Sequence, residues 1–523
     1  MSQPDLVVVG AGVAGLYAAL EGRRLGLQVT LICAGELPGG STRWAQGGVA
    51  APLAGWDEDA HAADTLAAGR GLCDAAAVET FVGEAHSHIQ RLHDLGVPFA
   101  PDRVREGGHS RSRIWHAYGD ATGRAVSETL AARVREAGVT VLEHTQVDQL
   151  LLDGGRVVGV GVGETRLLTH AVLLATGGYG RLYPVGTAPA GTTGQGLVLA
   201  ALAGAVLRDL EFVQFHPTAV LHDGAALLVS EAVRGAGGVL RNGLGERFMP
   251  ALDPQAELAP RDVVARAIAA QRRATGQVTL DISHLGAAEV RRRFPNITAR
   301  LAQVGLEFSA GPVEVQPAAH YSVGGVRTDL WGRSSVPGLL VAGEAASVGL
   351  HGANRLASNS LSEGLVFGAR AAQAAAELAP ARASGKPEAT PALSLPAGVS
   401  WAAVQPVFAA AAGLERCGPE LQAALDIWPE VYLHTSDKAT TPDAANVLLA
   451  AAVLQAALAR QETRGTHARS DFEQAAPQAC HADLRLCPAP PGGPAVWEQR
   501  TVPVSSTDLD LQPQPNSFFA LNK

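Results

Sequence analysis

Arg355 is the residue of this sequence that points most directly to ligand binding. It is the only formally charged residue between Glu344 and Leu361, in a stretch rich in Gly, Ala, Asn and Ser. Arginine keeps its charge and offers a planar fork of donors that fits a carboxylate. We therefore expect Arg355 to line a pocket for an anion. The alternative is a surface arginine without a ligand.

Three further side chains could bind the same anion. His216, Arg261 and His320 lie in a long segment, from about residue 210 to 320, that separates two strand-forming regions. Each is weak evidence alone, because an isolated histidine is more often a hydrogen-bonded structural residue. Together with Arg355 they are typical of a site for one small dianion.

The N-terminus contains the first element that would have to position such a site. Residues 5–9 form a β-rich run, Gly10, Gly12 and Gly15 form a tight turn, and residues 16–25 have helical apolar spacing. This pattern is typical of a pyrophosphate bound at a helix start. After the next strand, residues 28–33, the usual ribose-binding acid is missing. Either the adenosine end is held differently, or Glu36 reaches back.

Two later segments favour a flavin dinucleotide over a nicotinamide one. Residues 147–162 predict a hairpin, and the buried strand 171–175 ends in Thr176-Gly177-Gly178. A further buried strand, 339–342, is followed by Gly343 and Glu344 at its carboxyl end, where ligands of α/β sheets collect. The alternative is a set of three ordinary α/β turns.

Length and composition indicate a soluble globular protein of about three domains. The chain has 523 residues, 47% of them hydrophobic, and a formal net charge of -9 with no basic block, which argues against nucleic acid or an anionic membrane as a partner. The first apolar run leads into a glycine turn and lacks a basic flank, so we expect no export signal. The longest apolar runs, 197–207 and 447–459, are shorter than the ~18 residues that span a bilayer. Five scattered cysteines predict neither disulfides nor metal binding.

Six short motifs carry a resemblance to a known family. They are Ser41-Thr-Arg-Trp-Ala-Gln-Gly-Gly48, Arg105-Glu-Gly-Gly-His109, Gln214-Phe-His-Pro-Thr218, Pro260-Arg-Asp262, His320-Tyr321 and His351-Gly-Ala-Asn-Arg355. The chain resembles the flavoproteins of the succinate dehydrogenase and fumarate reductase superfamily, and within it the L-aspartate oxidase family. The resemblance extends from Asp5 to Arg469.

The resemblance implies an α/β fold. It consists of a Rossmann-like FAD-binding domain (1–209 and 322–385), an inserted α+β capping domain that binds the substrate (210–321), a linker (386–398), and a C-terminal helical bundle domain with an irregular tail (399–523). From the residues alone, 379–398 are Pro, Ala and Ser rich. Helical spacing predicts helices over 402–412, 421–433 and 443–462. Residues from Cys480 onward are expected to be irregular, and those from about Ser505 poorly ordered.

The resemblance also implies which residues bind FAD. They are Gly10, Gly12, Ala14, Gly15, Ser41, Thr42, Ala45, Gln46, Gly47, Gly48, Gln195, Glu344, Ser360 and Leu361. Ser41 stands where respiratory succinate dehydrogenases carry a histidine that is joined to the flavin, so we expect non-covalent FAD. Gln195 stands where an aspartate is usual, and Ala34 where a lysine is usual. We expect weaker or differently supported FAD binding from both.

Glu106 indicates the substrate. The aspartate oxidases carry a glutamate here and their succinate-specific relatives do not. A carboxylate beside the α-ammonium of aspartate is chemically appropriate. Without the resemblance, Glu106 could instead be an exposed residue paired with Arg105 or Arg111.

The implied reaction is oxidation of L-aspartate to iminosuccinate by hydride transfer from Cα to flavin N5. Arg355, His216, His320 and the Ser230 hydroxyl would hold the two carboxylates. Arg261 is the family's proton donor or acceptor. A free guanidinium has a pKa above about 12, so its role could instead be electrostatic, with Glu231 or Asp262 carrying protons.

The implied context is the first step of NAD synthesis in the cytoplasm. Dioxygen, giving hydrogen peroxide, or fumarate would reoxidise the flavin. The labile product would favour rapid use by quinolinate synthase through at most a transient contact. Two other interpretations remain open: a flavoprotein subunit of a membrane-bound succinate or fumarate enzyme, and a non-catalytic flavin-binding module.

Overall fold

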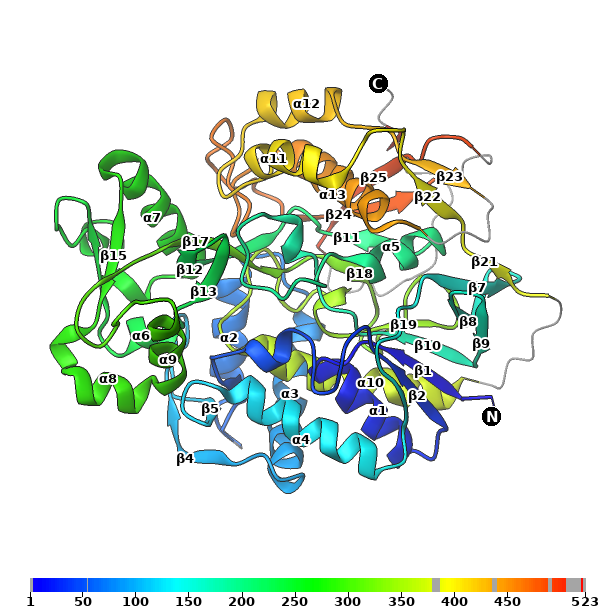
Figure 1. The fold of residues 1–523 in the computed structure, drawn as a ribbon, viewed down its shortest axis with the longest axis horizontal. Coiled ribbons are helices and arrows are strands. Elements are labelled where there is room, and N and C mark those ends of the chain that lie inside the picture. Colours follow the sequence, from blue (N-terminus) through cyan, green and yellow to red (C-terminus); the bar gives the residue numbers. More distant parts are fainter. Residues whose placement is uncertain are drawn as a thin grey trace.

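A five-stranded parallel sheet forms the centre of the protein (Figure 1). The computed structural model describes residues 3–53, 55–378, 386–434, 440–487, 492–504 and 519–520. The strand order is β19-β10-β1-β2-β6, and all neighbouring strands are parallel. The bounds are β1 Leu6–Val9, β2 Val29–Ile32, β6 Thr140–Leu142, β10 Ala171–Leu174 and β19 Leu339–Val341. The strands predicted over 5–9, 28–33, 171–175 and 339–342 are confirmed, and they lie side by side.

Helices cover one face of this sheet and a second sheet lies against the other. On the helical side α1 (Val13–Arg24) packs on α10 (Asn359–Glu377) and α4 (Thr122–Glu136), and α3 (Ala75–Asp94) packs on α10. On the other side β10 contacts β8, in the sheet β21-β7-β8-β9. Its bounds are β7 Gln149–Asp153, β8 Arg156–Val162, β9 Thr165–Leu168 and β21 Glu388–Ala389. The predicted hairpin over 147–162 is thus confirmed. Buried apolar strands with cover on both faces are typical of parallel sheets.

A small sheet carries the loop that contains Glu106. It has the order β3-β5-β4, with β3 at Val49–Ala50, β4 at Phe99–Val104 and β5 at Ile114–Ala117. Helix α2 (Glu58–Ala68) packs on α3 beside it.

The inserted segment forms a lobe with its own apolar core, coloured green in Figure 1. Its two three-stranded sheets have the orders β13-β12-β17 and β14-β15-β16. The strands are β12 Val213–His222, β13 Ala225–Leu228, β14 Val239–Asn242, β15 Val278–Asp281, β16 Val313–Glu314 and β17 Gln316–Ser322. The helices are α6 Glu231–Gly235, α7 Arg261–Thr275, α8 Ala287–Arg293 and α9 Pro295–Gln303.

The C-terminal region combines helices with strands. Helices α11 (Trp401–Ala411), α12 (Gly418–Asp426) and α13 (Pro442–Ala459) share the large core with α5 (Gln195–Leu202). The helix predicted over 421–433 ends at Asp426. The chain then forms β23 (Tyr432–His434), which pairs with β22 (Ala392–Ser394).

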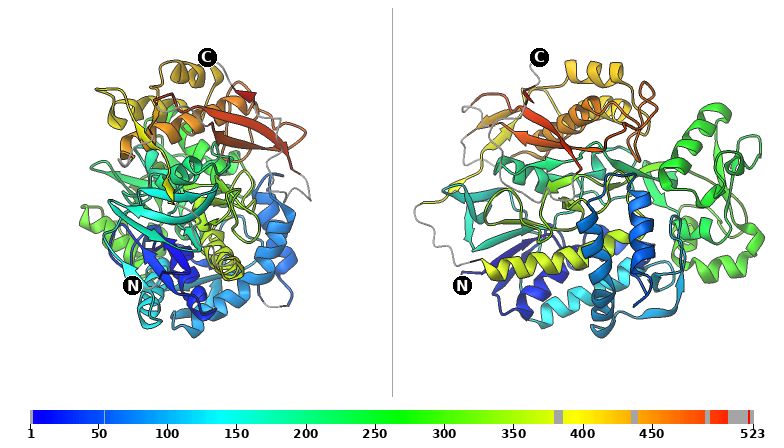
Figure 2. Two further views of the ribbon diagram at one scale, coloured as in Figure 1. Left: turned by 90° about the vertical axis from the view of Figure 1, so that its right-hand side faces the viewer. Right: turned by 180° about the vertical axis from the view of Figure 1, so that it is seen from behind.

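The prediction of irregular structure from Cys480 onward was wrong. Strands β24 (Cys480–Leu486) and β25 (Trp497–Pro503) form an antiparallel hairpin, drawn in orange and red in Figure 2. Strand β24 joins β11 (Leu207–Arg208), so the sheet order is β20-β18-β11-β24-β25-β26, with β18 at Gly325–Arg327, β20 at Ala346–Ser347 and β26 at Phe519–Ala520. The prediction that the chain is poorly ordered from Ser505 falls almost wholly outside the described residues.

Helix α13 is long and apolar enough, by length and composition, to cross a membrane. Of this helix, 67% is buried inside the protein, where it packs against α5, α11 and α12. It is the core helix of the C-terminal region.

Candidate active site

The candidate site lies where the inserted lobe meets the central sheet. Strands β12 and β17 pair antiparallel, with His216 opposite Ala318 and Gln214 opposite Tyr321, and α7 packs against both strands. The rings of His216 and His320 are thereby 5.2 Å apart in a T-shaped arrangement. Residues 210 to 355 thus bring together the four side chains that the sequence predicted to act as one group.

The two histidines are held as neutral rings. The backbone N–H of Thr218 donates to Nδ1 of His216 at 3.2 Å, so Nε2 of a neutral His216 carries the proton and is a donor. Nδ1 of His320 lies 2.7 Å from the Thr187 hydroxyl. Desolvation and then repulsion from Arg261 lower the pKa of both rings well below the ordinary value. The pair therefore offers hydrogen bonds without adding charge.

Gln214 connects the two arginines. Its side-chain oxygen accepts from Arg261 at 3.0 Å and from Arg355 at 2.9 Å, and its amide nitrogen donates to Asn354 and to the Arg355 carbonyl. Arg355 also lies 4.4 Å above the ring of Tyr321. Burial, and then Arg261, lower the pKa of Arg355 to about 10. Within the described residues its Nε has no hydrogen-bond partner, so the guanidinium retains a free donor.

Glu231 balances part of this positive charge. It accepts from Arg261 Nε at 2.6 Å and lies 3.6 Å from Arg234. Burial would raise the pKa of Glu231, but Arg261 and Arg234 together hold it below the ordinary value. Arg234 is fully buried, and in the described part of the chain its Nε and Nη2 have no hydrogen-bond partner. Asp262 lies outside this group and binds Arg266 at 3.2 Å.

Glu106 belongs to the site and is not a surface residue. Its side chain is buried, and Ser358 donates to Oε2 at 2.6 Å. Neither Arg105 nor Arg111 pairs with it: Arg105 is exposed, and Arg111 lies 3.5 Å from Asp57. The interpretation of Glu106 as an exposed residue was therefore wrong.

Glu106 lies close to the loop predicted to bind FAD. A Cβ at Gly47 would lie 3.4 Å from the Ser358 hydroxyl and 3.5 Å from Glu106 Oε1. Ser358 itself has a left-handed backbone, with φ of 60°, and its hydroxyl is directed to Glu106. The Gln46-Gly47-Gly48 loop and Glu106 thus form one surface.

Ser230 is the N-cap of α6. Its oxygen accepts from the Ala232 N–H at 3.3 Å, which leaves its own proton free to donate. The predicted hydrogen bond from Ser230 to a ligand stays a prediction, and the geometry leaves its donor available.

The residues predicted to hold FAD provide matching groups. Helix α1 begins after Gly12 and α10 begins at Asn359, and neither start has an acidic first turn or a capping bond from its own N-cap side chain. The Val13 N–H donates to Thr42 at 2.9 Å, and the other N–H groups at these starts remain to bind anionic parts of a ligand. Ser360 and Leu361 lie in the first turn of α10. Gln46 donates to the Leu228 carbonyl, while its buried oxygen has no partner among the described residues.

Three further residues considered for FAD binding, Glu36, Gln195 and Glu344, have partners within the chain. Glu36 is exposed, 3.5 Å from exposed His144, and Gln195 accepts from Gln146 at 2.7 Å. Glu344 accepts from the Ser322 N–H and hydroxyl, both at 2.9 Å. Desolvation raises the pKa of Glu344 to about 7, which favours hydrogen bonding over full charge near neutral pH.

Two loops connect the site to the C-terminal region. Arg266 of α7 donates to the Gly465 carbonyl at 3.0 Å, and the Thr466 N–H donates to the Ala353 carbonyl at 3.0 Å. Asn354 in turn donates to Asp262 at 3.3 Å. The C-terminal loop therefore fixes both the helix that begins with Arg261 and the loop that carries Arg355.

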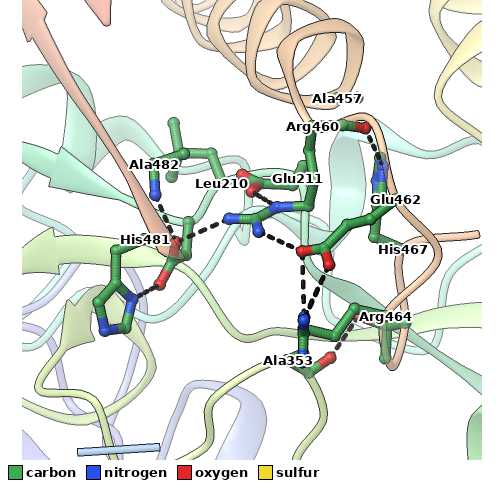
Figure 3. Close-up of polar contacts among 12 residues, drawn as sticks. Leu210, Glu211, Ala353, Ala457, Arg460, Glu462, Arg464, His467, His481 and Ala482 are labelled. Carbon is green, nitrogen blue, oxygen red and sulfur yellow. Dashed lines mark hydrogen bonds and ion pairs between the residues drawn. The ribbon is translucent and has the colours of Figure 1, made fainter. Parts of the chain in front are cut away.

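A buried charge network fixes that C-terminal loop (Figure 3). Arg460 pairs with Asp209, Glu211 and Glu462, and Glu462 also accepts from Arg464 at 3.0 Å. The network continues through His481, which lies 2.5 Å from Asp209, and His467, whose Nε2 lies 3.1 Å from the Arg460 carbonyl. We call these side chains the C-terminal network.

Sequence reasoning missed several residues that the structure places in the site. They are Gln214, Ser358, Thr187, Asn354 and His116. Gln214 lies two residues before His216 on the same strand, and this two-residue spacing could have indicated that Gln214 belongs to the site. The others contact the site through residues distant in sequence.

This arrangement, a parallel nucleotide-binding sheet with an arginine and histidine cluster under an inserted lobe, defines a flavoprotein of the fumarate reductase type. The sequence matches the family described as FAD binding domain over residues 5–361, and the family described as fumarate reductase flavoprotein C-term over residues 403–507. FAD is therefore its cofactor.

Solved structures agree with this class. An Escherichia coli quinol fumarate reductase superposes with a TM-score of 0.84 at 28% identity, covering 96% of both chains. A quinol-fumarate reductase solved with menaquinol has a TM-score of 0.86 at 28% identity, covering 98% of this chain and 99% of that one. The predicted fold class is confirmed.

Curated relatives give the narrower family. An L-aspartate oxidase of Agrobacterium fabrum is 46% identical, covering 92% of this chain and 93% of the relative. An L-aspartate oxidase of Streptomyces coelicolor is 43% identical, covering 89% of this chain and 88% of the relative. The chain belongs to the L-aspartate oxidase family.

Proposed function

We propose that this protein oxidises L-aspartate to iminosuccinate with FAD. The observation that carries the proposal is the charge of the site. Three arginines, Arg234, Arg261 and Arg355, face two glutamates, Glu231 and Glu106, while the histidines are neutral. The single net positive charge that results balances the single net negative charge of aspartate. Succinate and fumarate carry one more negative charge than aspartate, so the charge balance favours aspartate without excluding either dianion.

The same groups would orient the substrate. Arg355, with its free Nε, and the two histidines would bind the carboxylates together with Ser230, and Glu106 would bind the α-ammonium. Arg261 is held on both sides by Glu231 and Gln214, which favours a positioning and electrostatic role near developing charge. The buried setting excludes water, which strengthens each of these interactions.

FAD supplies the hydride acceptor, held by the Gly10–Gly15 turn, the Gln46-Gly47-Gly48 loop and the start of α10. Because Glu106 and Gly47 lie side by side, the ammonium-binding carboxylate borders the flavin loop. This would place the Cα–H of aspartate on the flavin side of the site.

The wider context follows from this chemistry. Dioxygen, giving hydrogen peroxide, or fumarate would reoxidise the flavin; the dicarboxylate groups that bind aspartate also suit fumarate. We place the enzyme in the cytoplasm at the first step of NAD synthesis, with quinolinate synthase as the consumer of its labile product.

The second candidate is a succinate or fumarate flavoprotein subunit, which the similarity to quinol fumarate reductases favours. Anaerobic mixing of the FAD-loaded protein with L-aspartate or with succinate distinguishes the two. We expect aspartate alone to bleach the oxidised flavin band, and oxygen to restore it with peroxide formation. Bleaching by succinate alone would replace our proposal with the second candidate, and bleaching by neither would leave a non-catalytic flavin module.

A further inference from the structure

His116 lies beside Glu106, and the proposed function gives it no role. It projects from β5, and its Nε2 lies 3.6 Å from Glu106 Oε1. A Cβ at Gly48 would come within 2.9 Å of this nitrogen, so His116 also borders the flavin loop. Among the described residues, Nε2 has no hydrogen-bond partner although it is buried.

The Thr122 hydroxyl lies beside the other ring nitrogen of His116. Nδ1 lies 3.4 Å from this hydroxyl, which accepts from the Ala117 N–H at 3.1 Å and lies 3.5 Å from the Ala117 carbonyl. In the tautomer in which the hydroxyl donates to that carbonyl, the ring donates from Nδ1 to Thr122, and the lone pair of Nε2 faces Glu106.

In this tautomer two acceptors, a carboxylate oxygen and an imidazole nitrogen, face each other with no proton between them. Other charges near the pair are Asp120, His109 and Arg234. Desolvation lowers the pKa of His116, against the opposing pull of Glu106 and Asp120. The α-ammonium of aspartate holds a proton that must leave before the C=N bond can form.

We propose that Glu106 and His116 form a relay that removes one proton from the α-ammonium of bound aspartate. The proton passes from the substrate nitrogen to Glu106 and on to Nε2 of His116, which becomes an imidazolium. The amine lone pair that this frees then forms the C=N bond as the Cα hydride leaves to FAD, which yields the iminium of the product. The inference rests on the proposed oxidation of aspartate.

The relay explains a requirement that binding alone does not meet. An ammonium nitrogen has no lone pair to form the C=N bond, and an isolated carboxylate is a weak base near neutral pH. Fumarate reduction at the same site involves no ammonium and does not need the relay. This difference separates the relay from a purely structural histidine.

The test compares His116→Gln with wild type, both loaded with FAD, in aspartate oxidation and in dye-driven fumarate reduction from pH 6 to 9. General acid–base groups contribute about 10²-fold or more. We expect kcat with aspartate to fall about 100-fold at pH 7 and to recover by about tenfold per pH unit, as substrate with a neutral amine becomes available. Fumarate reduction, FAD content and succinate affinity, the last two read from flavin absorbance, should stay within about twofold of wild type.

The matched control is His86→Gln, a histidine packed on Trp115 of the same strand, at 6.4 Å between rings and outside the site. It should leave both activities and both pH profiles unchanged. If His116→Gln fails to hold FAD, Thr122→Val carries the test, because it removes the acceptor of the Nδ1 proton and should cause a smaller but equally selective loss.

Two results would overturn the relay. One is a wild-type pH profile in His116→Gln; the other is an equal loss of both activities. A wild-type protein that does not oxidise aspartate at all would instead refute the proposed function.

Discussion

The C-terminal network and the cluster around Gln214 are both buried and rich in arginine, but their charges are paired differently. In the network, Arg460 and Arg464 meet three carboxylates, those of Asp209, Glu211 and Glu462. In the site, Arg234 and Arg261 share the carboxylate of Glu231. Within the described residues Arg355 makes no ion pair, and donors of Arg234 and Arg355 lack hydrogen-bond partners.

The difference shows how the two regions use burial. Charges that are paired within the chain hold segments together, and removing one partner leaves the other buried and uncompensated. Charges left unpaired destabilise the empty protein and are compensated only when a ligand arrives. The first arrangement serves the fold, and the second serves binding.

Arg355→Gln should produce the largest of the predicted effects, because it removes a charge that serves binding. Loss of a buried, hydrogen-bonded charge at a binding site costs about 2–5 kcal/mol, so kcat/KM for aspartate should fall about 10³-fold. The melting temperature of the substrate-free protein should stay level or rise, because one unpaired cation is gone. Steady-state kinetics and thermal melts check both halves, and a fall in melting temperature by many degrees would contradict the comparison.

Arg460→Met should produce the opposite pattern. It leaves Asp209, Glu211 and Glu462 without their shared cation, so unfolding should be easier by about 3–5 kcal/mol. Activity per folded molecule at low temperature should fall far less than in Arg355→Gln, because Arg460 acts on the site only through the C-terminal loop. Denaturant unfolding measures the loss. Arg273→Met is the matched control, because its ion pair with Glu415 is exposed and should contribute less than about 1 kcal/mol.

Glu106→Gln tests one charge within the site. The Glu106 carboxylate is expected to bind the ammonium that only aspartate carries, so its loss should lower kcat/KM for aspartate about 100-fold. This corresponds to about 2–3 kcal/mol of lost transition-state stabilisation. Fumarate reduction measured on the same sample should be unchanged or faster. Equal losses in both reactions would mean that Glu106 mainly supports the loop through Ser358.

The stability of the empty protein should fall on mild acidification, as the smallest of these effects. His216 and His320 have lowered pKa values, so between the unfolded pKa, near 6.5, and their folded pKa the unfolded state binds more protons. Unfolding free energy should therefore decrease as the pH falls below about 6.5, by at most about 1.4 kcal/mol per pH unit for each ring. Succinate should reduce this slope, because a bound dianion favours the protonated rings. Denaturant unfolding at pH 7, 6 and 5 checks this, and His320→Gln should remove part of the slope.

The central sheet could be predicted because its information is local. The apolar runs at β1, β10 and β19 each end in glycine-containing turns, and continuous apolar strands with such turns are a pattern that a sequence displays directly. His216, Arg261, His320 and Arg355 could be predicted because their chemical types are rare within neutral or apolar surroundings.

The partners of these residues could not be predicted in the same way. Gln214 reaches Arg355 across 141 positions, and Ser358 reaches Glu106 across 252. Such pairs depend on how strands register, which no local pattern encodes. The hairpin of β24 and β25 differs: Cys480, Ala482, Leu484 and Leu486 alternate along β24, but the proline-rich segment that follows obscured this signal.

The bond from Thr466 to Ala353 has a consequence for the order in which the protein is made. A ribosome completes the inserted lobe and the flavin-binding sheet long before it reaches residue 466, yet the two bonds from Thr466 to Ala353, beside Arg355, form only with that late segment. Strand β11 likewise gains its pairing with β24 only after residues 480–486 have been synthesised. A nascent or truncated chain would thus fold most of its flavin-binding region before the dicarboxylate site is finished, so substrate oxidation would begin only once synthesis is nearly complete.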